Sequence, residues 1–235
     1  MTDRISLDYW FPKLVGSGVN LPITEIIKTD ADFWPWLDGE ESPSANEFLN
    51  LLKSKGDEWG YPLFLRTGHT AAKHSWKDSC FVESEEKLGP CMFGLVETSA
   101  MALPGMPTDI WVIREFLDLD IRFHAFWGNM PIAVEWRFFI EPRRVICHHP
   151  YWPAEAFELI QHKPDDWSEL LEEMNNDITE KEFMLLEHFC DLVLVKGKFD
   201  GRWSVDFARG KNKTWYVTDM APMEVSYHWP GCENG

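Results

Sequence analysis

The sequence lacks the features that mark several large classes of protein. Its five cysteines include no C-x-x-C pair and their number is odd, so we expect neither a disulfide framework nor a structural zinc site. No apolar run approaches the roughly 20 residues needed to cross a membrane, and the first residues carry no secretory signal pattern. Free thiols fit a reducing compartment, and we expect a cytoplasmic protein.

Basic residues are also scarce. Lysine and arginine total 22 against 39 acidic residues, which gives a formal net charge of −17. Nucleic acids and anionic membranes are bound mainly through lysine and arginine, so both are disfavoured as partners.

The common phosphate-binding and catalytic motifs are missing. The chain contains no G-x-x-x-x-G-K-[ST], G-x-G-x-x-G, G-x-S-x-G or H-E-x-x-H sequence, which excludes P-loop, Rossmann, α/β-hydrolase and zincin chemistry. Residues 198–201, Lys-Phe-Asp-Gly, match the short nucleotidyl-lysine motif of nucleic-acid ligases. That motif lies early in those enzymes, whereas here it lies near the end of the chain, and Asp200-Gly201 is also typical of a plain turn.

The sequence is rich in residues that form hydrophobic cores. The chain has 235 residues, 45% of them hydrophobic, with 13 tryptophans and 16 phenylalanines. This is enough for one domain or two tightly joined lobes, and we divide the chain into an N-terminal lobe, residues 1–60, and a second region, residues 61–235. The aromatic rings either fill the core or line a ligand cleft.

Local patterns predict a mixture of helices and hairpins. Ser44 with Glu47 forms a capping box that predicts a helix ending at Gly56, and Thr179 with Glu182 predicts a second, to about residue 194. Residues 33–38 are expected to form a loop. Further helices are predicted over residues 84–102 and 165–174, and strands over residues 62–67, 111–117, 132–140, 145–149, 203–208 and 215–221. Recurring hairpins without a strict βαβ rhythm indicate an α+β fold with largely antiparallel sheets.

The strand predicted at residues 132–140 has two different faces. Trp136 and Phe138 fall on one face with Val134, whereas Glu135 and Arg137 fall on the other. Charged residues on one side of an apolar strand indicate either a wet cleft or an exposed sheet face.

The last predicted hairpin places two acidic residues together. If residues 211–214 form a four-residue loop, Asp206 lies opposite Asp219. Opposed like charges destabilise a sheet and raise each other's pKa, and a divalent cation would offset that cost. Mg²⁺ favours one or two carboxylates plus nucleotide phosphates, with Glu224 as a candidate third donor. Two alternatives stay open: a register shifted by one residue, or a metal-free acid/base pair as in glycosidases.

Several basic residues could hold phosphates. Arg66, Lys73, Arg114 and Arg137 come from different predicted elements, as a triphosphate site requires. Arg114 and Arg137 lie inside apolar strands, where an unpaired charge is costly. The alternative is a structural salt bridge, such as Arg114 with Glu135 or Arg137 with Glu115.

Four segments, in order, resemble one group of proteins. Residues 66–78 resemble the phosphate-covering strand and loop, and residues 112–117 the strand beneath adenine, of the ATP-grasp clade named for two arginines and one lysine. Residues 135–139 are similar to its E-x-R-x-F strand, and residues 203–206 with 216–219 to its metal-bearing strands. A relative of this clade is the eukaryotic assembly chaperone of translation initiation factor two. The resemblance spans residues 63–222, but Ala221 stands where the family usually has asparagine.

The resemblance implies an ATP-grasp-like fold in which two lobes with antiparallel sheets enclose a nucleotide cleft. It implies an ATP- and Mg²⁺-dependent ligase of the carboxylate–amine type, acting through an acyl phosphate on a small-molecule, peptide or protein acceptor. The alternative is a non-catalytic ATP-binding assembly factor. The implied roles are catalysis for Lys73 and Arg137, nucleotide binding for Arg66, Lys73, Arg114, Glu115, Phe116, Leu117, Glu135 and Arg137, and metal binding for Asp206, Asp219 and Glu224.

Overall fold

The computed structural model describes residues 3–230 and residue 232, and it divides into two compact units. The terminal unit comprises residues 3–22, 117–125 and the described part of 131–235. The central unit comprises residues 23–116 and 126–130. Neither unit coincides with the predicted lobe of residues 1–60, because residues 23–60 pack with the strands and helix that follow them.

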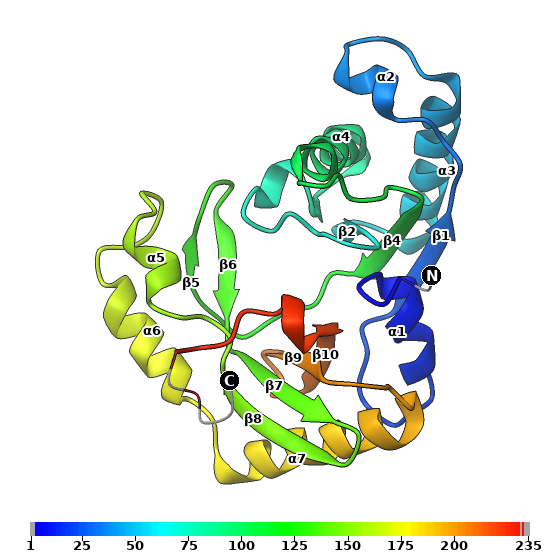
Figure 1. The fold of residues 1–235 in the computed structure, drawn as a ribbon. Helices are drawn as coiled ribbons and strands as arrows, with labels where there is room; N and C mark the ends of the chain where they lie inside the picture. The colour runs from blue at the N-terminus through cyan, green and yellow to red at the C-terminus, as the bar shows by residue number, and fades with distance from the viewer. Residues whose placement is uncertain (1–2, 231, 233–235) are drawn as a thin grey trace. The chain divides into compact units, whose positions relative to one another are not determined.

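The central unit is built on an antiparallel sheet of four strands in the order β1–β4–β2–β3. Helices α3 (Pro43–Trp59) and α4 (Glu85–Met101), with the short helix α2 (Trp34–Leu37), lie against one face of this sheet (Figure 1). Leu65, Trp111 and Ile113 point into the core that these helices cover. The strands are β1 (Thr24–Lys28), β4 (Ile110–Glu115), β2 (Leu63–Thr67) and β3 (Phe81–Val82), and β2 is followed by the 3-10 turn η1 (Trp76–Asp78).

Two local predictions for this unit are wrong. The N-cap of α3 is Ser42, whose hydroxyl accepts a hydrogen bond from the backbone of Ala45, not Ser44. Pro43 then takes the first helical position, which suits its fixed φ. The helix also runs through Gly56, where an added Cβ would lie 2.2 Å from the Tyr61 hydroxyl oxygen, and it ends at Trp59 with Gly60, φ +81°, as its C-cap. Residues 34–37 form α2 rather than loop, and Phe33 before them is buried in the core.

The terminal unit contains a second antiparallel sheet of four strands, in the order β10–β9–β7–β8. Its strands are β7 (Glu135–Glu141), β8 (Arg144–Pro150), β9 (Trp203–Arg209) and β10 (Trp215–Pro222). Helix α7 (Glu180–Gly197) packs against β7 and β8, and α1 (Leu7–Leu14) packs against α7 and β10. Further elements are the hairpin β5 (Ile121–Ala125) and β6 (Met130–Ala133), helices α5 (Glu155–Glu158) and α6 (Trp167–Asn176), and the turn η2 (Met223–Val225).

Most of the predicted elements of this unit are confirmed. The capping box of Thr179 and Glu182 starts α7, and both of its reciprocal hydrogen bonds are present. The predicted strand over residues 132–140 is instead two strands, β6 and β7, which separate at Val134. Trp136 and Phe138 pack on Phe183 of α7, so the predicted apolar face of β7 is the face toward the helix. The α+β class with antiparallel sheets is confirmed.

Among the described residues, every helix is too short or too polar to cross a membrane.

Candidate functional site

The final hairpin places two carboxylates opposite each other, as predicted, although by a different route. Asp206 on β9 pairs directly with Asp219 on β10. The predicted four-residue loop is wrong, because Trp215 pairs with Arg209 and the connection therefore spans residues 210–214.

A β-bulge on β10 compensates for the extra residue in this loop, so that Asp219 still pairs with Asp206. The ladder shifts between Val217 and Asp219, so Thr218 is an extra residue on β10. Had Thr218 continued the regular ladder opposite Asp206, strict alternation would have turned Asp219 toward the helices. The reverse side of β9 is apolar as expected: Val205 and Phe207 are completely buried.

Asp206 is held by an arginine on the neighbouring strand. Arg137 on β7 lies directly opposite Asp206, and its Nε and Nη2 donate to the two carboxylate oxygens at 2.7 and 2.8 Å. Bidentate pairs of this kind are strong and geometrically specific. The predicted alternative that Arg137 forms a structural salt bridge is therefore correct in kind, but its partner is Asp206 rather than Glu115.

Arg137 is surrounded on its remaining sides. Its guanidinium lies 4.8 Å from the centre of the Tyr151 ring, and Nη1 donates to the backbone carbonyl of Tyr227 at 3.0 Å. Burial would lower the pKa of Arg137, but the charges of Asp206 and Asp219 outweigh it and the pKa is raised. This arginine therefore stays charged and offsets part of the repulsion between the two aspartates.

The donor set at this hairpin fits a magnesium ion in part. Two carboxylates on one face are what Mg²⁺ takes from a protein when phosphates supply the other ligands. Glu224 lies on η2 and is exposed. Among the described residues, Asp206, Asp219 and Glu224 do not form a set whose ligand atoms all lie within 4.8 Å of one another. The structure thus brings together two of the three predicted metal ligands.

Glu135 lies on the same face of β7 as Arg137. Its side chain is 5% exposed, and one of its oxygens accepts a hydrogen bond from Trp152 Nε1 at 3.3 Å. The charged face predicted for this strand is therefore largely buried within the terminal unit.

In the central unit, two of the predicted phosphate-binding residues share one face of the sheet. Phe64 pairs with Arg114, and Arg66 pairs with Val112 two positions along, so Arg66 and Arg114 are diagonal neighbours. This is the face opposite the helices. Both arginines are 4% exposed, and Arg66 Nε donates to the carbonyl of Thr67 at 3.1 Å.

Aromatic rings lie on the same face of the central sheet. Trp76 lies 6.0 Å from Phe64, 5.6 Å from Phe81 and 6.3 Å from Phe116, measured between ring centres. Phe81 pairs with Phe64, which places it on the arginine face of the sheet. Apolar walls beside basic side chains are typical of ligand pockets.

Lys73 lies in a loop that hydrogen bonds make compact. Thr67 Oγ1 accepts from the backbone of Thr70, and Ser79 Oγ donates to the carbonyls of Ala72 and Ser75. Ala72 takes the left-handed conformation, with φ +46°. The half-buried Lys73 is therefore carried by an ordered turn within the segment whose sequence resembles a phosphate-covering strand and loop.

The residues expected to meet adenine come directly after strand β4. Glu115 is the last residue of the strand, and its carboxylate accepts a hydrogen bond from the backbone of Ile23 at 2.7 Å. Phe116 closes the first part of the central unit, and Leu117 begins the next part of the terminal unit. The side chain of Glu115 is thus engaged by the residue that precedes β1.

An ion network that sequence reasoning missed lies elsewhere in the terminal unit. Arg209 is 1% exposed and contacts Asp120 Oδ2 at 2.9 Å, Asp177, and Glu182 Oε1 at 3.0 Å. Lys213 also reaches Asp120, at 2.9 Å. These acids come from three separate regions of the chain, so no local pattern could have revealed the network. The network joins Arg209 of β9 to Glu182 of α7, to Asp177 at the C-cap of α6 and to Asp120 just before β5, which indicates a structural role.

The sequence match to a nucleotidyl-lysine motif has an ordinary explanation. Lys198 is the left-handed C-cap of α7, and Gly201 has φ +79°. The carbonyl of Asp200 accepts hydrogen bonds from Arg4 and Trp203. The segment is a helix end followed by a turn.

Comparison with known proteins gives a likeness at the level of fold. No protein-family model matches the chain, and no curated protein matches it in sequence. Among solved structures, the VanG D-Ala:D-Ser ligase from Enterococcus faecalis is similar, with a TM-score of 0.54 and 12% identity over 93% of this chain and 52% of that one. The D-alanine–D-alanine ligase from Coxiella burnetii gives a TM-score of 0.52 and 10% identity over 94% and 48%.

A third similar structure is a nucleotide complex. Carboxyaminoimidazole ribonucleotide synthase from Aspergillus clavatus, solved with ATP, gives a TM-score of 0.52 and 8% identity over 93% of this chain and 44% of that one. This chain spans about half the length of these three proteins. The chain has the same α+β fold as these three enzymes.

Proposed function

We propose that this protein is an ATP- and Mg²⁺-dependent ligase of the carboxylate–amine type. The observation that carries the proposal is the pairing of Asp206 with Asp219 beside Arg137, in a chain whose fold is that of ATP-grasp ligases. A carboxylate pair of this kind is costly unless a cation accompanies it. The residues named below lie in the segments that resemble the two-arginine, one-lysine clade.

The carboxylates of Asp206 and Asp219 would hold magnesium, with Glu224 reaching it only through a movement of η2. When bound, magnesium neutralises charge on the phosphates and fixes their orientation. Arg137 keeps the Asp206 carboxylate in place by its two hydrogen bonds and adds a positive charge at the same point. Glu135, on the same strand face, is proposed as a further polar group at the nucleotide.

The resemblance also assigns nucleotide-binding roles to residues of the central unit. Lys73 and Arg66 are proposed to hold phosphates, and Arg114, on the same sheet face as Arg66, supplies further positive charge. The backbone of residues 115–117 is proposed to meet the adenine edge, since the Glu115 side chain is occupied by Ile23.

The proposed chemistry needs no protein nucleophile. The γ-phosphoryl group passes to an acceptor carboxylate to form an acyl phosphate and ADP, and an amine then displaces phosphate to form an amide. Phosphoryl transfer depends chiefly on positioning and on stabilising developing charge. Lys73 and Arg137 are the residues proposed to do this, and the acceptor is a small molecule, a peptide or a protein.

One observation favours a second candidate, a non-catalytic ATP-binding assembly factor. Ala221 occupies the position where the family usually supplies an asparagine, so one expected oxygen donor is missing from β10. Binding of ATP without turnover would follow if that donor were needed only for catalysis.

The test is nucleotide binding followed by turnover. Mg²⁺ with ATP at about 100 times the dissociation constant should raise the melting temperature by about 5–10 °C. Asp219→Asn and Lys73→Ala should each abolish the shift, whereas the surface controls Asp191→Asn and Lys53→Ala should retain it. Equal melting curves with and without Mg²⁺–ATP would contradict both candidates and favour a hydrolase with paired carboxylates. ADP release that depends on an added carboxylate and amine would distinguish the ligase from the assembly factor.

A further inference from the structure

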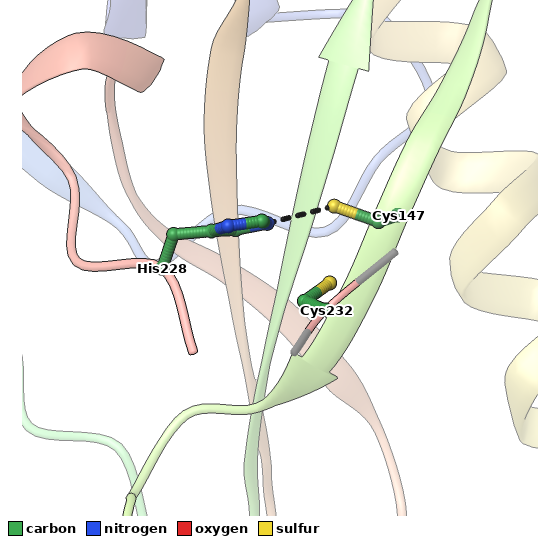
Figure 2. A group of neighbouring side chains, drawn as sticks. All are labelled: Cys147, His228 and Cys232. Atoms are coloured by element: carbon green, nitrogen blue, oxygen red, sulfur yellow. Dashed lines mark hydrogen bonds between the residues drawn. The ribbon is translucent and has the colours of Figure 1, made fainter. Parts of the chain in front are cut away.

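Three potential metal ligands converge at the end of the terminal unit, away from the carboxylate hairpin. Cys147 lies on β8, and His228 and Cys232 lie in the segment that follows η2. Cys147 Sγ is 3.0 Å from His228 Nε2, and one ligand atom from each residue lies within 4.8 Å of the others. Figure 2 shows the two sulfur atoms and the edge of the imidazole ring turned toward one another.

We propose that these residues form a zinc site. Two thiolates and an imidazole are ligands that Zn²⁺ prefers, whereas Mg²⁺ and Ca²⁺ prefer oxygen. In a tetrahedral zinc site with Zn–S and Zn–N bonds of about 2.3 and 2.0 Å, ligand atoms are roughly 3.3–3.8 Å apart. The Cys147–His228 separation of 3.0 Å is slightly below that range and the other separations are at most 4.8 Å, so small side-chain movements would admit the ion. This site is independent of the proposed function.

His149 supplies a second observation at the same place. It lies two residues from Cys147 on the same face of β8, it is 5% exposed, and its ring centre is 5.7 Å from that of His228. Its Nδ1 is 2.7 Å from the carbonyl of Pro150, whereas its buried Nε2 has no hydrogen-bond partner in the part of the chain that the structure describes.

The hydrogen bond from His149 Nδ1 to the Pro150 carbonyl fixes the tautomer in which the Nε2 lone pair can bind a metal. When Nδ1–H donates to a backbone carbonyl, the lone pair is on Nε2, and histidines that bind metals are usually held in this way. We therefore assign His149 Nε2 to the fourth position, although it lies outside the set of three that already converge. The four ligands would then be two cysteines and two histidines, as in closed structural zinc sites.

Proton balance is simple at this site. Burial, together with the neighbouring Cys232, raises the pKa of the Cys147 thiol to about 12, so without a cation the sulfur keeps its proton. Binding one Zn²⁺ releases the two thiol protons and leaves the four-ligand centre neutral. Affinity should consequently weaken as the pH falls.

The site would tie the C-terminal segment to the sheet. The carbonyl of Tyr227 accepts from Arg137, and Ser226 Oγ lies 2.7 Å from Ser204 Oγ. His228 packs edge-on against Phe139 at 4.4 Å. A metal bound by Cys147 of β8 together with His228 and Cys232 would hold these two residues at the sheet face that carries Arg137.

The experiment measures metal directly in untagged, reduced full-length protein. We expect about one zinc per chain by elemental analysis, and Co²⁺ substitution should give thiolate charge-transfer and tetrahedral visible bands. Cys147→Ser, Cys232→Ser and His228→Ala should each lose the bands, and His149→Ala should weaken cobalt binding by at least about tenfold. The controls Cys91→Ser, in α4, and His188→Ala, on the exposed side of α7, should retain them.

The site would be overturned by reduced protein that takes up neither Zn²⁺ nor Co²⁺, or by metal bands that survive all three ligand variants. A Cys147–Cys232 disulfide that persists in reductant would also overturn it. Unchanged cobalt affinity in His149→Ala would remove His149 from the ligand set. Circular dichroism of each variant shows whether it is folded. Because metal is read from its own spectrum, failure here is separate from failure of ATP binding.

Discussion

The two units contain sheets of the same construction whose outer faces carry opposite charge. Each has four antiparallel strands with helices on one face. On the other face, the strand positions of the central sheet include three basic residues and no acidic one, whereas those of the terminal sheet include four acidic residues and two arginines. Stability does not require such a separation. The predictions below test what the charged residues of each face contribute to stability and to binding.

The largest effect should come from an arginine of the terminal unit that serves the fold. Arg209→Met leaves Asp120, Asp177 and Glu182 without their shared buried partner, and we expect a loss of about 3–5 kcal/mol in the free energy of unfolding. Urea denaturation measures it. Lys213→Met removes an exposed member of the same network and should cost at most about 1 kcal/mol. Equal losses in the two variants would show that the buried arginine is not the centre of the network.

An arginine of the central sheet should behave in the opposite way. Arg114→Met should lower the affinity for Mg²⁺–ATP at least about tenfold, because a charged phosphate contact is lost. Its unfolding free energy should change by no more than about 1 kcal/mol, since methionine suits a buried strand position. Isothermal titration calorimetry and urea denaturation give the two numbers, with Lys53→Met as the matched surface control. A stability loss as large as that of Arg209→Met would contradict the distinction between the sheets.

A smaller effect should show how much the contact between Arg137 and Asp206 contributes to stability. In a double-mutant cycle of Arg137→Met and Asp206→Asn, we expect a coupling of about 1–2 kcal/mol in the free energy of unfolding. The bidentate contact between the two side chains is the physical reason. Additive effects would mean that the pair contributes nothing to stability in solution.

The smallest effect should be an acid dependence around Arg209. Burial would raise the pKa values of Asp120, Asp177 and Glu182, but their hydrogen bonds and basic neighbours lower all three. Their ordinary values are 3.8 for aspartate and 4.5 for glutamate. Because the folded values are lower still, this stabilisation is present above about pH 4.5 and is lost as the pH falls through them. Unfolding free energies measured from pH 6 down to about 3 should fall, and fall less steeply in Arg209→Met. If the curves of the wild type and of Arg209→Met are parallel, this network does not cause the loss of stability in acid.

Local sequence patterns predicted local structure well, and partners distant in the chain poorly. The capping box at Thr179 and the alternation around Arg137 were sufficient to place α7 and the faces of β7. The N-cap predicted at Ser44 was wrong because Ser42 can also cap a helix, and the proline that follows it favours the first helical position. The partner of Arg137 depends on the register between β7 and β9, which are far apart in the sequence. The gathering of Cys147 with His228 depends on where the C-terminal segment crosses the sheet, and no spacing rule contains that information.

The extra residue at Thr218 has a consequence for how such hairpins are recognised. A turn one residue shorter, without the bulge, would present the same two carboxylates to the same side of the sheet. Related chains can therefore lengthen or shorten this turn while keeping the acidic pair, provided that the strand absorbs the difference. A search that fixes the number of residues between the two aspartates would miss such chains, whereas one that compares which side of the strand each aspartate occupies would find them.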